Sequence, residues 1–207
     1  MESITIADKQ VALCRMKIDD GWSCSSDRPD EMIVPIFPTV YTPRNEADNI
    51  YYDAILENVK EGDKVLVVGC GSGADSWVAW TKCKTKIYVI DINEMAILNT
   101  YATANIGGFE VRPVLGDIRD MELPDDFKNF DWVLWSMPHL GERLEENNYH
   151  DGDDGSILKA FVELLPKLGG KAIIWNRKKA QKFIDLPYEI IKTNNMGSVV
   201  ILIKGLT

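Results

Sequence analysis

Three glycines after an apolar run mark the first place where this sequence could bind a ligand. In "VLVVGCGSGADSW", Gly69, Gly71 and Gly73 alternate with Cys70 and Ser72, and residues suited to a helix follow. Glycine permits positive φ and a close backbone approach, and the start of a helix presents free N–H groups to a ligand. The spacing is one residue out of step with the G-x-G-x-x-G of dinucleotide-binding bends, so an NAD-dependent oxidoreductase is the weaker alternative.

Two acids follow at the ends of the next two apolar runs. Asp91 ends "KIYVID", and Asp117 lies in "LGDIRD" after the following run. A carboxylate can accept hydrogen bonds from both hydroxyls of a ribose, and an acid on the adjacent strand could accept one from an adenine amino group. Each glycine or acid could instead turn a loop or cap a helix. Their occurrence together and in order favours binding of a ribose-containing cofactor.

The elements that must position these residues alternate between strands and helices. One apolar run of strand length ends at the glycines, and further runs lie at residues 86–91, 110–117, 130–137 and 171–176. In residues 93–105 and 155–168 the apolar residues recur at helical spacing. Near-continuous apolar strands that alternate with helices predict a parallel sheet covered on both faces. Residues 189–193 and 198–204 predict an antiparallel hairpin. We therefore expect an α/β fold: a doubly wound, mostly parallel, seven-stranded sheet with a C-terminal antiparallel hairpin.

The N-terminal part differs from this pattern. Residues 10–18 and 32–38 are short apolar pieces separated by a polar stretch, and helical spacing begins at Asn49. We expect residues 1–48 to form an N-terminal arm or substrate lid. Residues 49–207 then form the cofactor-binding domain.

Composition disfavours several classes of function. The net charge of −9 disfavours a nucleic acid partner, because phosphate binding relies on Lys and Arg. Neither a membrane-spanning run nor a secretory signal is recognisable, so the predicted location is the cytoplasm. Four cysteines without C-x-x-C spacing and two histidines predict no metal site. The acidic stretch 141–155 favours a solvated loop over a cation site, since it lacks the ligand spacing of a calcium loop.

Five segments in this order resemble class I S-adenosylmethionine-dependent methyltransferases: "VLVVGCGSG", "VIDIN", "GDIRD", "FDWVLWSMP" and "LLPKLGGKAIIW". The resemblance covers about residues 49–207 and implies a Rossmann-like methyltransferase fold with S-adenosylmethionine as cofactor. It places the methionine part of the cofactor near Gly69 to Gly73, including Cys70, and the ribose on Asp91. It places the adenine between Ile92 and Ile118, with Asp117 on its amino group.

The segment before the glycines, "VYTPRNEADNIYYDAIL", resembles that of release-factor glutamine methyltransferases and related amide and amine N-methyltransferases. This resemblance adds Glu46 as a cofactor contact. Those relatives carry N-P-P-[YF] after the fourth strand, where this chain has Ser136, Met137, Pro138 and His139. Loss of the Asn disfavours a planar amide or nucleobase acceptor. Ser136 is nevertheless expected to contact the cofactor.

Methyl transfer is an in-line displacement that needs orientation in a dry cleft more than a dedicated catalytic group. For a hydroxyl or protonated amine acceptor a base is required, and His139 is the candidate; otherwise it lines the pocket. Trp135 and Trp175 near strand ends could form a flat substrate platform. The basic stretch "NRKK", at 176–179, could meet a carboxylate or phosphate.

The sequence thus predicts S-adenosylmethionine-dependent methyl transfer to a nitrogen or oxygen nucleophile of a small molecule or protein side chain. Residues 1–48 and 139–156 are expected to form substrate walls. A non-catalytic binding subunit with the same fold and an aminopropyl transferase remain as alternatives. The sequence leaves the oligomeric state open.

Overall fold

The computed structural model describes residues 3–6, 9–17, 31–43, 45–136, 155–195 and 197–204. A seven-stranded sheet forms its centre, with strand order β6-β5-β4-β7-β8-β10-β9. Neighbours from β6 to β8 pair in parallel, whereas β10 runs antiparallel to both β8 and β9. This confirms the predicted sheet and its C-terminal hairpin. The strands are β4 (Val65–Val68), β5 (Ile87–Asp91), β6 (Val111–Leu115), β7 (Trp132–Ser136), β8 (Lys171–Arg177), β9 (Tyr188–Thr193) and β10 (Ser198–Ile203).

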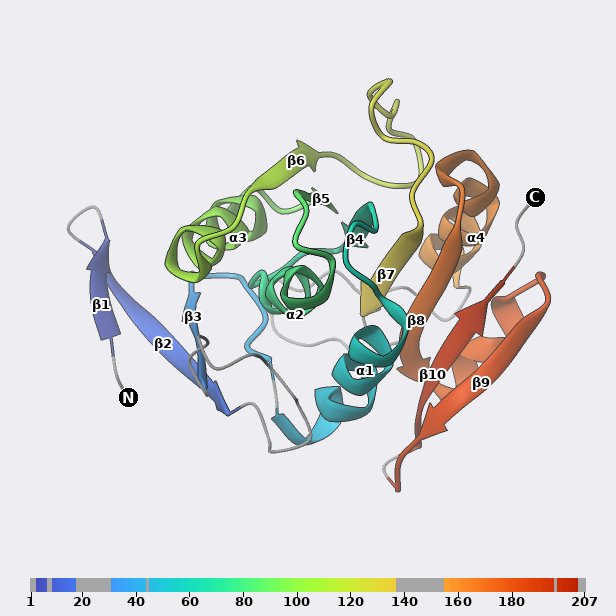
Figure 1. Cartoon of the computed structure of the whole chain (residues 1–207), viewed down its shortest axis with the longest axis horizontal. Coiled ribbons are helices and arrows are strands. Elements are labelled where there is room, and N and C mark those ends of the chain that lie inside the picture. The colour runs from blue at the N-terminus through green and yellow to red at the C-terminus, as the bar shows by residue number, and fades with distance from the viewer. Residues whose placement is uncertain are drawn as a thin grey trace.

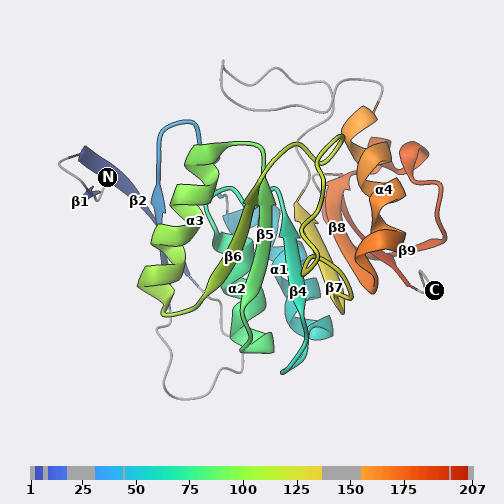
Figure 2. The same cartoon turned by 90° about the horizontal axis from the view of Figure 1, so that it is seen from above.

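Helices cover both faces of this sheet (Figures 1 and 2). Three of them, α1 (Asn45–Asn58), α2 (Ala74–Cys83) and α3 (Glu94–Gly107), lie on one face, and α4 (Ser156–Leu168) lies on the other. A short 3₁₀ helix, η1 (Lys178–Phe183), follows β8. Successive strand side chains point to opposite faces, so a strand covered on both sides must be apolar throughout. In β4, Val65 and Val67 pack toward α1 and α2, while Leu66 and Val68 pack toward α4.

A second, three-stranded antiparallel sheet precedes the domain. It contains β1 (Ser3–Ile6), β2 (Lys9–Lys17) and β3 (Glu31–Ile36) in that order. β3 contacts α3, and its Met32 and Val34 are buried in the same apolar cluster as α1 and α2. The described part of the N-terminal segment before residue 37 is therefore largely β-strand, and β3 shares a core with the larger sheet.

α1 begins earlier than the sequence analysis expects. The helix starts at Asn45, so it crosses the expected boundary between residues 48 and 49. Its first turn contains mostly polar residues, and the apolar spacing that marks a helix begins only at Ile50. The apolar pattern therefore gives the buried part of the helix and misses its polar start.

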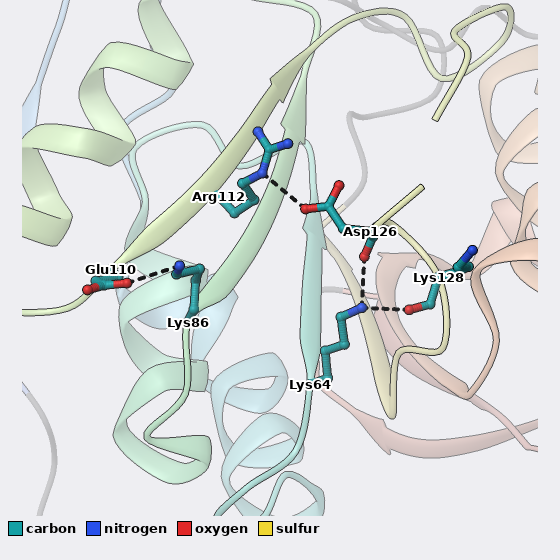
Figure 3. Close-up of polar contacts among 6 residues, drawn as sticks. All are labelled: Lys64, Lys86, Glu110, Arg112, Asp126 and Lys128. Atoms are coloured by element: carbon teal, nitrogen blue, oxygen red, sulfur yellow. Dashed lines mark hydrogen bonds and ion pairs between the residues drawn. The ribbon is translucent and has the colours of Figure 1, made fainter. Parts of the chain in front are cut away.

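Hydrogen bonds and an ion pair hold the connection between β6 and β7 at the edge of the sheet where β4 begins (Figure 3). Lys64 Nζ donates hydrogen bonds to the carbonyl oxygens of Asp126 (2.8 Å) and Lys128 (2.6 Å) and lies 4.7 Å from the ring centroid of Tyr88. Arg112 on β6 pairs with the Asp126 carboxylate at 3.1 Å. These contacts hold residues 126–128 at the edge opposite the carboxyl ends of the parallel strands.

In the described ranges, no helix combines the length and the apolar character that a bilayer-crossing segment requires.

Candidate functional site

The glycine bend, defined as residues 69–73 between β4 and α2, adopts backbone angles that few side chains tolerate. Gly69, Gly71 and Gly73 have φ of 66°, 49° and 83°. A Cβ on Gly73 would lie 3.0 Å from the Cα of Thr100 and from the Cβ of Thr103 on α3. A Cβ on Gly71 would meet nothing nearer than the Gly69 carbonyl oxygen at 3.9 Å. The bend is therefore packed against α3 at Gly73 and open at Gly71.

Cys70 lies inside this bend. Its thiol is buried, with Sγ 3.9 Å from the Ala96 carbonyl oxygen, and burial raises the pKa of the thiol well above its ordinary value. A neutral, enclosed thiol leaves the backbone at Cys70 as the part that can face a ligand.

Asp91 is the last residue of β5, and its carboxylate faces the glycine bend. Oδ2 accepts a hydrogen bond from the Gly71 N–H at 3.0 Å, and Oδ1 accepts one from the Asn93 N–H at 2.9 Å. A carboxylate has about four acceptor positions, so each oxygen keeps a lone pair for a ligand hydroxyl. Burial raises the pKa of Asp91, while the two N–H donors act to lower it.

Asn93 connects this strand end to the segment that follows β3. Its side chain caps α3 by accepting from the Met95 N–H at 2.9 Å. Its Nδ2 lies 3.2 Å from both the carbonyl oxygen and the hydroxyl of Thr39. The segment between β3 and α1 therefore passes beside the residues expected to bind the ribose.

Asp117 follows β6 one strand away. The backbone places it beside Asp91, because the Gly116 N–H donates to the Asp91 carbonyl oxygen at 2.9 Å. Its carboxylate is engaged by the Arg119 guanidinium through both oxygens, and these hydrogen bonds lower the pKa of Asp117. An adenine amino group would share this carboxylate with Arg119. Ile92 and Ile118, the residues expected on either side of the adenine, are both half-buried.

Ser136 ends β7, where it is half-buried and pairs in register with Trp175 of β8. Trp135 and Trp175 point to opposite faces of the sheet and are nearly enclosed, with 2% and 5% of their surface exposed. Trp135 packs on Phe161 of α4 with ring centroids 4.2 Å apart. Both indoles therefore serve the apolar cores, and neither forms an exposed substrate platform.

Several expected site residues lie outside what the structure describes. His139 and nearly all of the acidic stretch 141–155 fall in the undescribed range 137–154. Glu46 lies in the first turn of α1, where the backbone is described and the side chain is not. Their roles stay predictions. Among the residues with described side chains, no three His, Cys, Asp or Glu gather in a way that could hold a metal ion.

Sequence reasoning missed three polar residues that contact the glycine bend from α3. Asn99, Thr100 and Thr103 are fully buried, and each donates a hydrogen bond to a carbonyl oxygen of the bend. The pattern analysis used only the apolar residues of this helix. A usable signal was present, because these three short polar side chains lie at spacings that place them on one helix face.

Comparison with known proteins shows what this chain is similar to. Residues 65–149 match the family model described as "Methyltransferase domain". The matched segment is that of a class I S-adenosylmethionine-dependent methyltransferase domain. A curated relative, the fatty-acid O-methyltransferase of Mycolicibacterium smegmatis, is 33% identical over 117 residues, which cover 52% of this chain and 41% of that protein.

Solved structures share the fold of this methyltransferase domain. The 16S rRNA N2 G1207 methyltransferase of T. thermophilus, solved with AdoMet and guanosine, has a TM-score of 0.69 at 14% identity. The match covers 94% of this chain and 50% of that one. The ribosomal protein L11 methylase of Lactobacillus delbrueckii subsp. bulgaricus has a TM-score of 0.61 at 15% identity, covering 89% and 91%. The chain thus spans half or less of the fatty-acid and rRNA enzymes.

The family match over residues 65–149, together with structural neighbours solved with AdoMet or SAH, confirms the predicted cofactor, S-adenosylmethionine. The site fits it in two respects that the structure shows directly. The open side of Gly71 leaves room against bare backbone, and Asp91 keeps acceptor positions for both ribose hydroxyls. Which residues contact the cofactor remains a set of predictions.

Proposed function

We propose that this chain transfers the methyl group of S-adenosylmethionine to an oxygen nucleophile of a small molecule, with the carboxylate of an apolar acid as the leading candidate. Asp91 carries the cofactor part of the proposal, because its carboxylate is oriented by two backbone N–H groups beside the open glycine bend. The acceptor class is supported by the fatty-acid O-methyltransferase, which is 33% identical over 117 residues.

The cofactor, when bound, supplies an electrophilic methyl group on a sulfonium. An acceptor oxygen forms the new O–CH₃ bond with a lone pair, and the electrons of the breaking C–S bond go to sulfur. A carboxylate acceptor is ionised at neutral pH, so no proton has to be removed. The protein then needs to bind, orient and exclude water, and His139 would serve as a wall of the pocket.

In this proposal, residues at the ends of neighbouring strands bind different parts of the cofactor and the acceptor. The glycine bend after β4 and Asp91 on β5 would hold the methionine and ribose parts of the cofactor. Ile92, Ile118 and Asp117 would hold the adenine, with Asp117 oriented by Arg119. Ser136 at the end of β7 lies on the side of β4 away from Asp91, where an acceptor would enter.

The first experiment titrates S-adenosylmethionine and NAD separately into the purified protein by calorimetry, with Asp91→Ala as the control. We expect binding of S-adenosylmethionine alone, and a strong loss in the variant because two ribose hydrogen bonds disappear. Binding of neither cofactor would favour the non-catalytic binding subunit.

The acceptor class is tested next by incubating the protein with methyl-labelled cofactor and a series of fatty acids. A matched series of fatty amines of the same chain lengths serves as control. Label in the methyl ester supports an oxygen acceptor, whereas label only in the amines would overturn that part of the proposal.

A further inference from the structure

Polar side chains on one face of α3 donate hydrogen bonds to the backbone of the glycine bend. Thr100 Oγ1 donates to the Gly71 carbonyl oxygen at 3.2 Å, and Thr103 Oγ1 donates to the Ser72 carbonyl oxygen at 2.6 Å. Asn99 Nδ2 donates to the same Ser72 oxygen at 3.0 Å. All three side chains are fully buried, where an unmade hydrogen bond is costly. The carbonyl oxygens of Gly71 and Ser72 are thus fixed toward the helix.

Fixing these carbonyls also fixes the donors of the bend. A trans peptide is planar, so its carbonyl and the following N–H point in opposite directions. The N–H groups of Ser72 and Gly73 are therefore turned away from α3. The Gly73 N–H closes the bend on the Cys70 carbonyl oxygen at 2.8 Å.

Gly71 is held from both sides. Its carbonyl oxygen accepts from Thr100, and its N–H donates to Asp91 Oδ2 at 3.0 Å. A shift of the Gly71 peptide would move the donor that orients the Asp91 carboxylate. Thr100 therefore acts on Asp91 through Gly71 without touching Asp91.

Asn99 extends the same network to the segment after β3. Its Oδ1 accepts from the Phe37 N–H at 2.7 Å, and its Nδ2 also donates to the Pro35 carbonyl oxygen at 2.7 Å. One buried amide thus joins Ser72 of the glycine bend, 27 residues away in sequence, to Pro35, which is 64 residues away. Thr39, further along this stretch, contacts Asn93 beside Asp91.

We propose that Asn99, Thr100 and Thr103 are positioning residues, which set the glycine bend so that Asp91 meets the ribose and which tie the 35–39 segment to the occupied site. The inference rests on the proposed function, since it assumes that the bend and Asp91 bind S-adenosylmethionine. Specifically, hydrogen bonds from α3 determine how strongly the site binds the ribose hydroxyls.

The test uses Thr100→Val, which removes the hydroxyl and keeps the shape, with Thr100→Ser as the matched variant that keeps the hydroxyl. Calorimetry measures binding of S-adenosylhomocysteine and of its 2′-deoxyribose analogue to each protein. Wild type should prefer the full ribose by about tenfold, the value of roughly one good hydrogen bond. Thr100→Val should lose most of that preference, and Thr100→Ser should keep it.

A purely structural role would give another result. Thr100→Val would then be less stable in urea and would bind both ligands more weakly by the same factor, leaving the ribose preference unchanged. That outcome would overturn the inference while leaving the proposed function intact. Failure of wild type to bind either ligand would overturn the proposed function and this inference together.

The role proposed for Asn99 is tested by a separate measurement, which does not require mutating this buried residue. Hydrogen exchange at the Phe37 amide should slow when S-adenosylhomocysteine binds, because Asn99 couples this amide to the bend. In Thr103→Val, which loosens the Ser72 carbonyl, the slowing should shrink, whereas Thr103→Ser should retain it. An exchange rate at Phe37 that does not respond to the ligand would overturn the coupling.

Discussion

Asp91 ends β5 and Asp117 follows the neighbouring strand β6, and their pKa values are shifted in opposite directions. Asp91 is half-buried, and desolvation outweighs the hydrogen bonds from its neutral donors, so its pKa is raised. Asp117 is paired with the Arg119 guanidinium, so its pKa is lowered. Opposite pKa shifts at these two acids give separate experimental signatures for the two predicted contacts, with the ribose and with the adenine.

The raised pKa of Asp91 predicts how cofactor binding depends on pH. Both ribose hydroxyls donate hydrogen bonds, so the ionised carboxylate is the binding form. As pH falls from neutral, affinity for S-adenosylhomocysteine should decline before groups with the ordinary value of 3.8 begin to titrate. Below the folded pKa, each further pH unit should cost about tenfold. Calorimetry across this range measures the effect.

Asp91→Asn is the control, and its weaker binding should not show this pH dependence. The unliganded protein should show the opposite sign in stability. Because the folded pKa is raised, the contribution of Asp91 to stability is fully present below the ordinary value and is lost as pH rises through the folded pKa. Affinity that stays constant down to acid unfolding would contradict the assignment.

Substitution of Asp117 tests its predicted contact with the adenine amino group. Asp117→Ala should weaken S-adenosylhomocysteine binding about fivefold, because one hydrogen bond to the adenine amino group is lost. The same change should not affect an analogue that lacks the amino group. Asp120→Ala, an exposed acid three residues away, serves as the control and should leave both affinities unchanged. Equal losses for both ligands would contradict a direct contact.

At the scale of elements, the site depends on how closely the glycine bend packs against α3. Gly73 begins α2 with φ of 83°, and an added Cβ would press on two atoms of α3 at 3.0 Å. Contacts that short are rare, so the helix or the bend must move. The tight approach at Gly73 brings the Thr100 and Thr103 hydroxyls within reach of the bend carbonyls.

Gly73→Ala should therefore be more destabilising than an alanine at an open glycine of similar backbone. Gly62 is the matched control, with φ of 88° and nothing within 4 Å of an added Cβ. Gly62→Ala should cost about 1 kcal/mol from backbone strain alone. Gly73→Ala should cost roughly twice that or more and should weaken cofactor binding. Urea unfolding and calorimetry measure both effects, and equal costs would contradict the packing argument.

At the scale of the whole molecule, one edge of the sheet carries the predicted cofactor site and the opposite edge carries contacts that stabilise the fold. The glycine bend, Asp91 and Asp117 lie at the carboxyl ends of the parallel strands. Lys64 lies at the opposite edge, where it donates hydrogen bonds to the backbone carbonyls of Asp126 and Lys128 (Figure 3). Its ammonium group also lies over the rings of Tyr88 and Phe130. Stability and cofactor binding should therefore be separable by mutation.

Lys64→Met should lower the free energy of unfolding by about 2 kcal/mol, because two hydrogen bonds from a charged donor are lost. Affinity for S-adenosylhomocysteine should remain at the wild-type value. Lys86→Met is the control, since Lys86 pairs with Glu110 in an exposed contact worth about 0.5 kcal/mol or less. A loss of cofactor affinity in Lys64→Met comparable to that in Asp91→Ala would contradict the separation of the edges.

The sequence by itself determined the main elements of the sheet and predicted which residues bind the cofactor. Apolar runs gave the strands because a doubly covered sheet requires them, and the ordered glycines and acids placed Gly71 and Asp91 at one edge. These features follow from local patterns and from the rule that parallel strands end together. The methyltransferase resemblance added the cofactor.

Only the tertiary structure decided how those residues are held. Sequence patterns gave a C-terminal hairpin, but they did not show that β10 lies between β8 and β9, since that choice depends on long-range pairing. They did not show that Arg119 engages Asp117, or that Asn99 joins Ser72 to Phe37. Side-chain hydrogen bonds between distant segments leave no periodic pattern, so they become visible only when the chain is folded.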